Sequence, residues 1–153
     1  SEYTKDLFIQ DPAGHETPES LFPDANKLTQ NINGNQLLQV PELKYTAFAS
    51  YLLPLPGGSN LELFGVYSWI DEVYYSPFES ETEKAESYDR TDVRATWTSA
   101  AGNWVVSGFV NNIFDDVGVL QVLRQGEGEF FRHTAGTTTP RLYGLEVTYS
   151  LGQ

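Results

Sequence analysis

Apolar and polar residues alternate along the last segment of the chain, 140-PRLYGLEVTYSLGQ-153. A period of two is typical of a β-strand that turns one face to an apolar medium and the other to water. The apolar face would carry Tyr143, Leu145, Val147, Tyr149 and Leu151. The opposite face would carry Gly144, Glu146, Thr148 and Ser150. The segment therefore predicts a closing strand with one apolar face.

Four earlier segments follow the same period, and helical signals are scarce. The predicted strands are 42–53, 60–75, 88–99 and 103–114. The fourth is ambiguous, since Trp104, Val106 and Val110 share one face while Val105 and Phe109 make the other face apolar as well. A shorter segment, 3–10, is a possible sixth strand fragment. The pattern predicts an all-β fold, an antiparallel meander of about five long strands.

The connections alternate between short and long. Residues 54–59 and 100–102 have turn composition, whereas 10–41, 76–87 and 115–139 are long and mostly polar. Tight turns on one edge and extended loops on the other are the pattern of an outer-membrane β-barrel. A soluble sandwich or a lipocalin-like barrel also has alternating strands and stays open as an alternative.

Aromatic residues lie near the ends of the predicted strands. Amphipathic rings prefer the boundary between lipid and water, so their placement favours the membrane alternative. The aromatic residues concerned are Tyr45, Tyr51, Tyr67, Trp69, Trp97, Trp104, Tyr143 and Tyr149. Trp97 and Trp104 are therefore expected to share the lipid-facing surface with the apolar residues of the closing strand.

Charge and composition narrow the classes of partner. Nine basic against 21 acidic residues give a net charge of −12, which makes nucleic acid an improbable partner. The absence of cysteine excludes disulfides and thiolate metal sites. Since the chain starts at Ser1 and contains no methionine, we expect a processed or truncated piece. No apolar run approaches the roughly 20 residues of a membrane-spanning helix.

The acidic residues offer one candidate metal site. Glu79, Glu81 and Glu83 lie in one long loop, and Asp115 and Asp116 begin another. Oxygen-rich loops suit Ca²⁺, although the spacing matches no EF-hand and a solvated acidic loop is the simpler interpretation.

Other catalytic or binding signals are weak. His15 and His133 lie in separate loops, Gly126 and Gly128 have no strand-to-helix setting for a phosphate, and no nucleophile motif is present. An enzyme is therefore not expected, and no cofactor is predicted beyond that Ca²⁺ ion.

Four stretches of the chain together resemble the C-terminal end of a TonB-dependent outer-membrane receptor. They are 33–55, 59–77, 93–116 and 138–151. The third is the closest match, with a short Gly-Asn turn, a Trp-led strand and then Asn-hydrophobic-Phe-Asp. The fourth resembles the Pro-Arg-aromatic-Gly opening of the family's final strand.

The resemblance implies the place of this chain in a larger barrel. In the family, the last strand closes the barrel and usually ends on an aromatic residue, whereas here Leu151-Gly152-Gln153 follows Tyr149. Barrels of this class need about 22 strands around a plug, so five cannot close. The expected division is a partial strand and long polar loop over 1–41, the C-terminal barrel strands over 42–151, and a tail over 152–153.

The resemblance also implies partners and a location. The parent would lie in the bacterial outer membrane and take up a siderophore-like or other scarce nutrient, reaching the TonB system only through N-terminal parts outside this chain. Residues of this chain that could contact an anionic ligand are Arg94, Arg124, Phe130, Phe131, Arg132 and Arg141.

Two hypotheses remain for the chain by itself. Its two open sheet edges predict pairing with other copies or with the rest of the barrel, giving filaments or tubes and, without the parent, an extracellular location. The alternative is a soluble all-β binding module for sugar or Ca²⁺, which would be a monomer without detergent.

Overall fold

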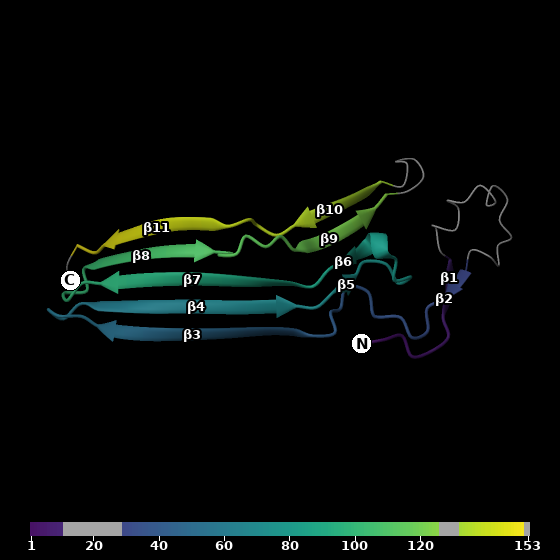
Figure 1. Ribbon diagram of the computed structural model, residues 1–153, viewed down its shortest axis with the longest axis horizontal. Helices are drawn as coiled ribbons and strands as arrows, with labels where there is room; N and C mark the ends of the chain where they lie inside the picture. Colours follow the sequence, from purple (N-terminus) through teal and green to yellow (C-terminus); the bar gives the residue numbers. More distant parts are fainter. Residues whose placement is uncertain (11–28, 126–131, 152–153) are drawn as a thin grey trace. The chain divides into compact units, whose positions relative to one another are not determined.

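A five-stranded antiparallel sheet is the main element of the computed structural model, which describes residues 1–10, 29–125 and 132–151. The strand order is β11-β8-β7-β4-β3, so each strand pairs with a neighbour in the sequence of long strands (Figure 1). The strands are β3 (Lys44–Pro54), β4 (Asn60–Ile70), β7 (Tyr88–Thr98), β8 (Trp104–Asn111) and β11 (Leu142–Tyr149). The predicted all-β meander of five long strands is confirmed.

Two tight turns join the long strands at one end of the sheet. In the turn after β3, the amide of Leu55 donates to the carbonyl of Ser59 at 2.8 Å, and Gly57 and Gly58 have φ values of 85° and 86°. Only glycine adopts such values without strain, which explains the Gly-Gly pair. The turn after β7 has Gly102 at φ 72°. Both short connections predicted from turn composition are thus confirmed.

Two predicted strands are too long. The segment predicted as 60–75 ends its sheet pairing at Ile70, and Val73–Tyr74 instead forms β5, which pairs with β6 (Lys84–Ala85). The intervening Asp71-Glu72 explains the break, since acidic residues are depleted in strands. The segment predicted as 103–114 ends at Asn111, because the next residue, Asn112, has a φ of 55° and leaves the extended conformation.

The long connections contain short elements that the periodicity did not predict. β1 (Phe8–Gln10) pairs with β2 (Thr29–Asn31), so only the end of the predicted fragment 3–10 is a strand. β9 (Val119–Arg124) pairs with β10 (His133–Thr137), and a 3-10 turn, η4, spans Glu81–Glu83. These elements are too short to show a period in sequence.

The chain forms two compact units. The loop unit comprises 1–42, 72–86 and 120–136, so the three long connections gather together. The sheet unit comprises 43–71, 87–119 and 137–153. The domain boundaries predicted from sequence, at residues 41 and 151, stay a prediction.

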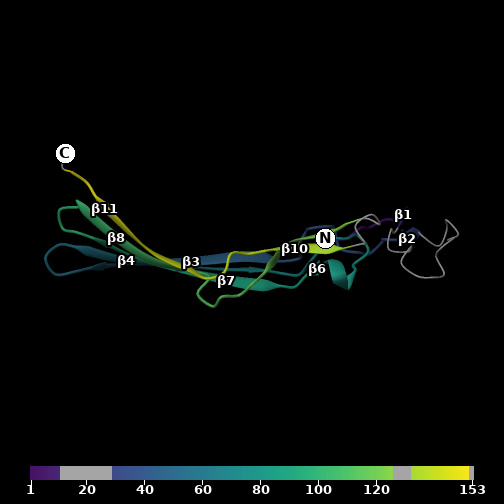
Figure 2. The same cartoon turned by 90° about the horizontal axis from the view of Figure 1, so that it is seen from above.

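Burial differs between the units. Among the described residues the buried apolar side chains are Ile32, Val73 and Ala85, and all three belong to the loop unit. The five long strands form a single twisted layer, as Figure 2 shows from above. No helix in the described part of the chain is long and apolar enough to span a membrane. The sheet unit therefore has no buried apolar core of its own within the described residues.

Candidate functional site

The register of the sheet brings the apolar residues of all five strands to one face. Tyr45 lies opposite Trp69, Leu61 opposite Trp97, and Trp104 opposite Tyr149. The apolar face comprises Tyr45, Ala47, Ala49, Tyr51, Leu53, Leu61, Leu63, Gly65, Tyr67, Trp69, Val93, Ala95, Trp97, Trp104, Val106, Gly108, Val110, Tyr143, Leu145, Val147 and Tyr149. Many of these side chains are exposed, with Tyr143 at 77% and Leu145 at 71%.

The residues predicted for this face fall where the periodicity placed them. Tyr143, Leu145, Val147 and Tyr149 share it with Trp97 and Trp104, whereas Leu151 follows β11 and is 85% exposed. Their contact with lipid stays a prediction.

Aromatic side chains cluster at two opposite ends of the apolar face. Near the start of β3, the ring of Tyr45 lies 5.5 Å from that of Trp69 and 6.0 Å from that of Tyr67, centroid to centroid. Near the end of β11, the rings of Trp104 and Tyr149 are 4.6 Å apart. Two aromatic groups with an apolar band between them are the arrangement of residues that lie at both boundaries of a lipid bilayer.

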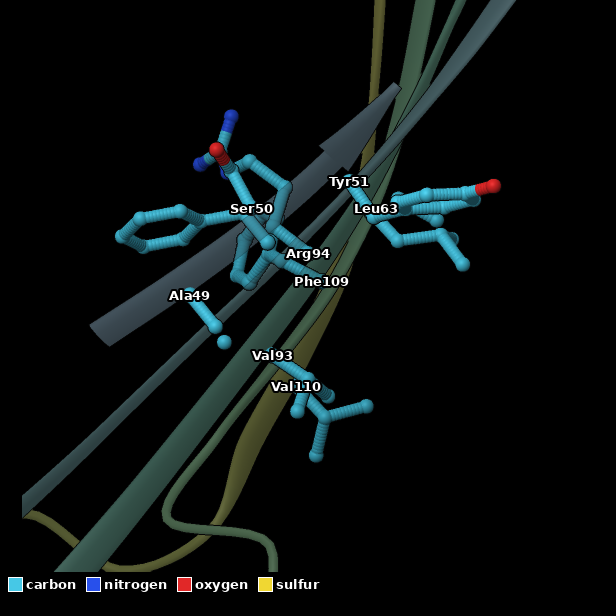
Figure 3. Close-up of a pocket in the computed structure, with 11 residues that line it drawn as sticks. Ala49, Ser50, Tyr51, Leu63, Val93, Arg94, Phe109 and Val110 are labelled. Atoms are coloured by element: carbon cyan, nitrogen blue, oxygen red, sulfur yellow. The ribbon is translucent and has the colours of Figure 1, made fainter. Parts of the chain in front are cut away.

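A shallow hollow of about 540 Å³ lies in the middle of the apolar face. Tyr51, Leu63, Val93 and Val110 project from this face, while Arg94 and Phe109 point away on the opposite side (Figure 3). Small residues such as Ala49, Gly65 and Ala95 line the hollow. Tyr51 supplies the one hydroxyl among the lining side chains on this side of the sheet, and the rest of that lining is apolar.

The opposite face carries ion pairs and hydrogen bonds, and we call it the polar face. The guanidinium of Arg94 donates to a carboxylate oxygen of Glu146 at 2.8 Å and lies 5.1 Å from the ring centroid of Phe109. The hydroxyls of Thr96 and Ser107 are 3.0 Å apart. Paired charges and satisfied hydroxyls allow much of this face to border water, as the lumen face of a membrane barrel does, although exposed Phe48 and Leu52 on β3 also lie on it.

Two glycines accommodate aromatic rings. A Cβ at Gly144 would stand 2.5 Å from Cζ of Phe109, the residue directly opposite on β8. A Cβ at Gly118 would stand equally close, at 2.5 Å, to the ring of Tyr88. Real Cβ atoms do not approach so closely, so glycine is required at each position if the ring keeps its place. The Gly of the Pro-Arg-aromatic-Gly motif thus has a packing role.

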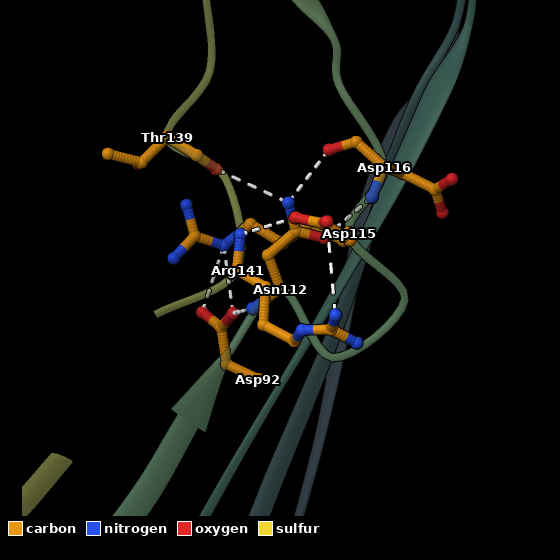
Figure 4. Close-up of polar contacts among 7 residues, drawn as sticks. Asp92, Asn112, Asp115, Asp116, Thr139 and Arg141 are labelled. Carbon is orange, nitrogen blue, oxygen red and sulfur yellow. Dashed lines mark hydrogen bonds and ion pairs between the residues drawn. The ribbon is translucent and has the colours of Figure 1, made fainter. Parts of the chain in front are cut away.

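A buried asparagine ties the end of β8 to the start of β11. Asn112 is 2% exposed; its side-chain amide donates to the carbonyls of Asp116 (2.7 Å) and Thr139 (3.3 Å), and its side-chain oxygen accepts from the amide of Asp116 (3.1 Å). Its own backbone amide donates to Asp92 at 2.7 Å (Figure 4). Asn112 tolerates its left-handed backbone better than most residues, because asparagine is enriched there.

Neighbouring aspartates, one threonine and one arginine complete this arrangement. We call it the Asn112 clasp, and its members are Asp92, Asn112, Asp115, Asp116, Thr139 and Arg141. Asp115 accepts from the backbone amide of Arg141 at 2.7 Å, and the two side chains are 4.0 Å apart. Asp92 accepts both 2.9 Å and 3.1 Å bonds from Nε of Arg90. The clasp therefore links the segments 93–116 and 138–151, which are separate motifs in the sequence.

In the loop unit, Lys84 organises the acidic residues. Its ammonium, with a side chain 14% exposed, lies 2.9 Å from Glu72, 3.5 Å from Glu86 and 3.8 Å from Glu81. The hydrogen bond with Glu72, together with the charges of the three carboxylates, raises the pKa of Lys84 above its ordinary value. Burial, the largest cause, raises the pKa of Tyr74 nearby. The acidic run is therefore partly neutralised.

A second hollow, of about 390 Å³, lies within the loop unit. Its lining combines aromatic, apolar and charged side chains, including Tyr75, Phe78, Glu83, Leu123 and Arg124. Its size and mixed lining are within the range of small-molecule sites.

The five carboxylates predicted to bind Ca²⁺ do not form one cluster. They lie in two different regions of the chain, and several bond to other residues of the chain. Glu79 accepts from the amide of Gln36 at 2.6 Å, Glu81 faces Lys84, and Glu83 is buried with 8% exposure. Asp115 and Asp116 belong to the clasp. Within the described residues, no three carboxylate or histidine side chains gather as a metal site. The Ca²⁺ site stays a prediction without a ligand cluster.

The residues suggested as anionic-ligand contacts are dispersed. Arg94 pairs with Glu146, Arg141 lies in the clasp, and Arg132 donates to the side chain of Gln125 at 3.1 Å. Phe130 and Phe131, like His15, Gly126 and Gly128, lie outside the described residues.

Sequence reasoning missed the roles of Asn112, Thr139 and Lys84. For Asn112 a signal was present, since asparagine directly after an apolar strand often marks a left-handed residue.

Comparison with known proteins gives one match. Residues 9–113 of the 153 match the family model described as TonB dependent receptor-like, beta-barrel. No curated protein and no solved structure matches the chain.

Proposed function

Because the chain belongs to the TonB-dependent receptor-like β-barrel family, we propose that its long strands form the C-terminal part of a receptor barrel. The family lies in the bacterial outer membrane and consists of transporters rather than enzymes. The parent receptor would take up a siderophore-like or other scarce nutrient, using energy delivered through the TonB system.

One observation carries this proposal: an apolar face spans five strands, broken only by Asp89 and Thr91 at one end of β7, with aromatic groups at both ends and ion pairs and hydrogen bonds on the face behind it. A lipid-facing exterior and a water-facing lumen need this division of faces. In a soluble sandwich, the apolar face would pack about 10 Å from a second sheet. The sheet unit has no such layer among the described residues.

The number of strands supports a larger closed barrel. Within the described residues, each edge strand of the sheet has one hydrogen-bonded neighbour: β3 pairs with β4, and β11 pairs with β8. Unpaired edge groups cost several kcal/mol each in lipid, so further strands must cover both edges in a membrane. A transporter barrel of about 22 strands would supply them.

The test compares two arginine substitutions on β11 in the complete receptor. Val147→Arg places a charge on the apolar face, and Thr148→Arg places the same charge on the polar face. We expect Val147→Arg to abolish heat-modifiable assembly in the outer-membrane fraction and uptake of a radiolabelled ferric siderophore. Thr148→Arg should keep assembly. Equal assembly of the two variants would contradict the proposal.

We also propose that the chain alone associates through its open edges into filaments or tubes. Unpaired edges template pairing with another copy, and the exposed apolar face exceeds what soluble monomers present. Negative-stain electron microscopy in detergent-free buffer should show regular assemblies. A monodisperse monomer in size-exclusion chromatography would refute this proposal and favour the soluble binding module.

A further inference from the structure

The connection between β8 and β11 is too long to set how these two strands align. Residues 112–141 separate them, whereas 55–59 and 99–103 join their strands by tight turns. A tight turn fixes the register of a hairpin through its geometry, and a long connection does not. Another feature must therefore determine the register of β11.

Hydrophobic matching does not select a single alignment. A slip of one residue would turn the apolar side chains of β11 to the wrong face, but a slip of two keeps every side chain on its own face. Leu145 and Val147 pair with Gly108 and Val106, and their neighbours on this face, Tyr143 and Tyr149, are also apolar. A two-residue slip would exchange one apolar pair for another.

Contacts on the polar face distinguish the native register only in part. A slip of two would place Leu142 or Glu146, in place of Gly144, opposite the ring of Phe109. It would also move Glu146 along the strand from Arg94, although these side chains are 56% and 43% exposed. Exposed ion pairs contribute little, so this pair discriminates weakly.

The Asn112 clasp provides the strongest discrimination. It holds the carbonyl of Thr139 and the backbone amide of Arg141, and Arg141 directly precedes Leu142, the first residue of β11. Shifting β11 by two residues would break the bond from the buried amide of Asn112 to Thr139 and the bond from the amide of Arg141 to Asp115, while the Asn112 amide keeps its bond to Asp116. Each lost hydrogen bond costs free energy, so the clasp penalises each slipped alignment.

We propose that the Asn112 clasp fixes the register of β11 on β8 and so determines the height at which the closing strand ends. This proposal concerns contacts within the sheet unit and does not rest on the proposed transport role, because cross-linking between β8 and β11 is measured without an uptake assay. The proposed role of Asn112, Asp115 and Thr139 is to hold the two strands in register, which is distinct from metal or ligand binding.

Disulfide trapping reads the register directly, since the chain contains no cysteine. Val106→Cys/Val147→Cys reports the native alignment, because the two residues are paired. Val106→Cys with Leu145→Cys or Tyr149→Cys reports the two alignments slipped by two. Paired residues lie roughly 4.5–5.5 Å apart between Cα atoms, within disulfide reach, whereas diagonal neighbours at roughly 7–8 Å exceed it.

The clasp is broken by Asn112→Gly, which removes the side chain without straining the backbone at φ 55°. Asn112→Asp is the second variant, since it keeps the acceptor and loses the donor. Asn111→Ala is the matched control, because this neighbouring asparagine takes no part in the clasp. The complete receptor carrying these pairs is oxidised in phospholipid vesicles. In the Asn112→Gly background we expect slipped cross-links to increase about tenfold over the control.

Two results would overturn the proposal. One is equal yields of slipped cross-links in the Asn112→Gly, Asn112→Asp and Asn111→Ala backgrounds. The other is failure of the native pair to cross-link in the otherwise unmodified chain, which would contradict the register itself.

Discussion

Replacing Gly144 by alanine tests the packing of the final strand most sharply. The added Cβ would stand 2.5 Å from Cζ and 2.9 Å from Cε1 of Phe109. Carbon atoms are in optimal contact at about 3.5–4.0 Å, so the ring would have to withdraw by about 1 Å. Overpacking of this kind costs about 1–3 kcal/mol. The usual gain from replacing a strand glycine by alanine, about 0.5–1 kcal/mol, reduces this cost.

The net expectation is that Gly144→Ala lowers the free energy of unfolding by about 1 kcal/mol, the middle of a range of about 0–2.5 kcal/mol. The assay is equilibrium urea unfolding of the complete receptor in phospholipid vesicles, followed by tryptophan fluorescence. Gly108→Ala is the matched control, because nothing lies within 4 Å of a Cβ at that position. This control should be neutral or slightly stabilising.

A double-mutant cycle separates overpacking from other effects. In the Phe109→Ala background the ring is absent, so Gly144→Ala should no longer destabilise the sheet. If Gly144→Ala destabilises equally with and without the ring of Phe109, or behaves like Gly108→Ala, the reasoning is refuted.

Three further predictions concern polar groups. The side-chain amides of Asn31 and, more weakly, Asn33 hold the pKa of Asp6 below its ordinary value. The stabilisation from these bonds is therefore present above that ordinary value and is lost as pH falls through the folded-state pKa. Asp6→Asn should remove this acid-dependent change in the asparagine amide signals measured by NMR; a change that persists would contradict it. A double-mutant cycle of Arg94→Ala and Glu146→Ala should give about 0.2–1 kcal/mol, because both side chains are exposed; a value well outside this range would contradict it. Thr96→Val should lower the free energy of unfolding in urea by about 1–2 kcal/mol, because it leaves the hydroxyl of Ser107 on β8 buried and unpaired. Thr98→Val should be near neutral, and equal costs for the two variants would contradict this prediction.

The strands and their faces could be predicted from the sequence because both follow from a period of two. The segment 88–99 became β7 (Tyr88–Thr98) almost unchanged, and the register puts Trp97 on one face with Val93 and Ala95. The strand ends were less predictable. Val73 and Tyr74 continue the apolar pattern of β4, yet they pair with Lys84–Ala85 across residues 75–83, a local pairing that replaces the longer strand.

The contacts that hold the sheet together could not be predicted, because they depend on register. Gly144 and Phe109 are 35 positions apart, and only the alignment of β11 on β8 brings them opposite each other. The clasp depends on the same alignment, since Asn112 reaches Thr139 across a long connection. Periodicity specifies which face a residue occupies and leaves open which residue it meets.

The central claim is that one face of the sheet borders lipid and the other borders water. Single cysteines at positions 142, 143 and 145–148 of β11 can each carry an environment-sensitive fluorophore, because the chain has no native cysteine. Quenching is then compared between a lipid-soluble and a water-soluble quencher, with the labelled chain as part of the complete receptor in phospholipid vesicles. Labels at Tyr143, Leu145 and Val147 should be quenched from the lipid, and those at Leu142, Glu146 and Thr148 from the water. Equal access of the water-soluble quencher to both sets would contradict the account.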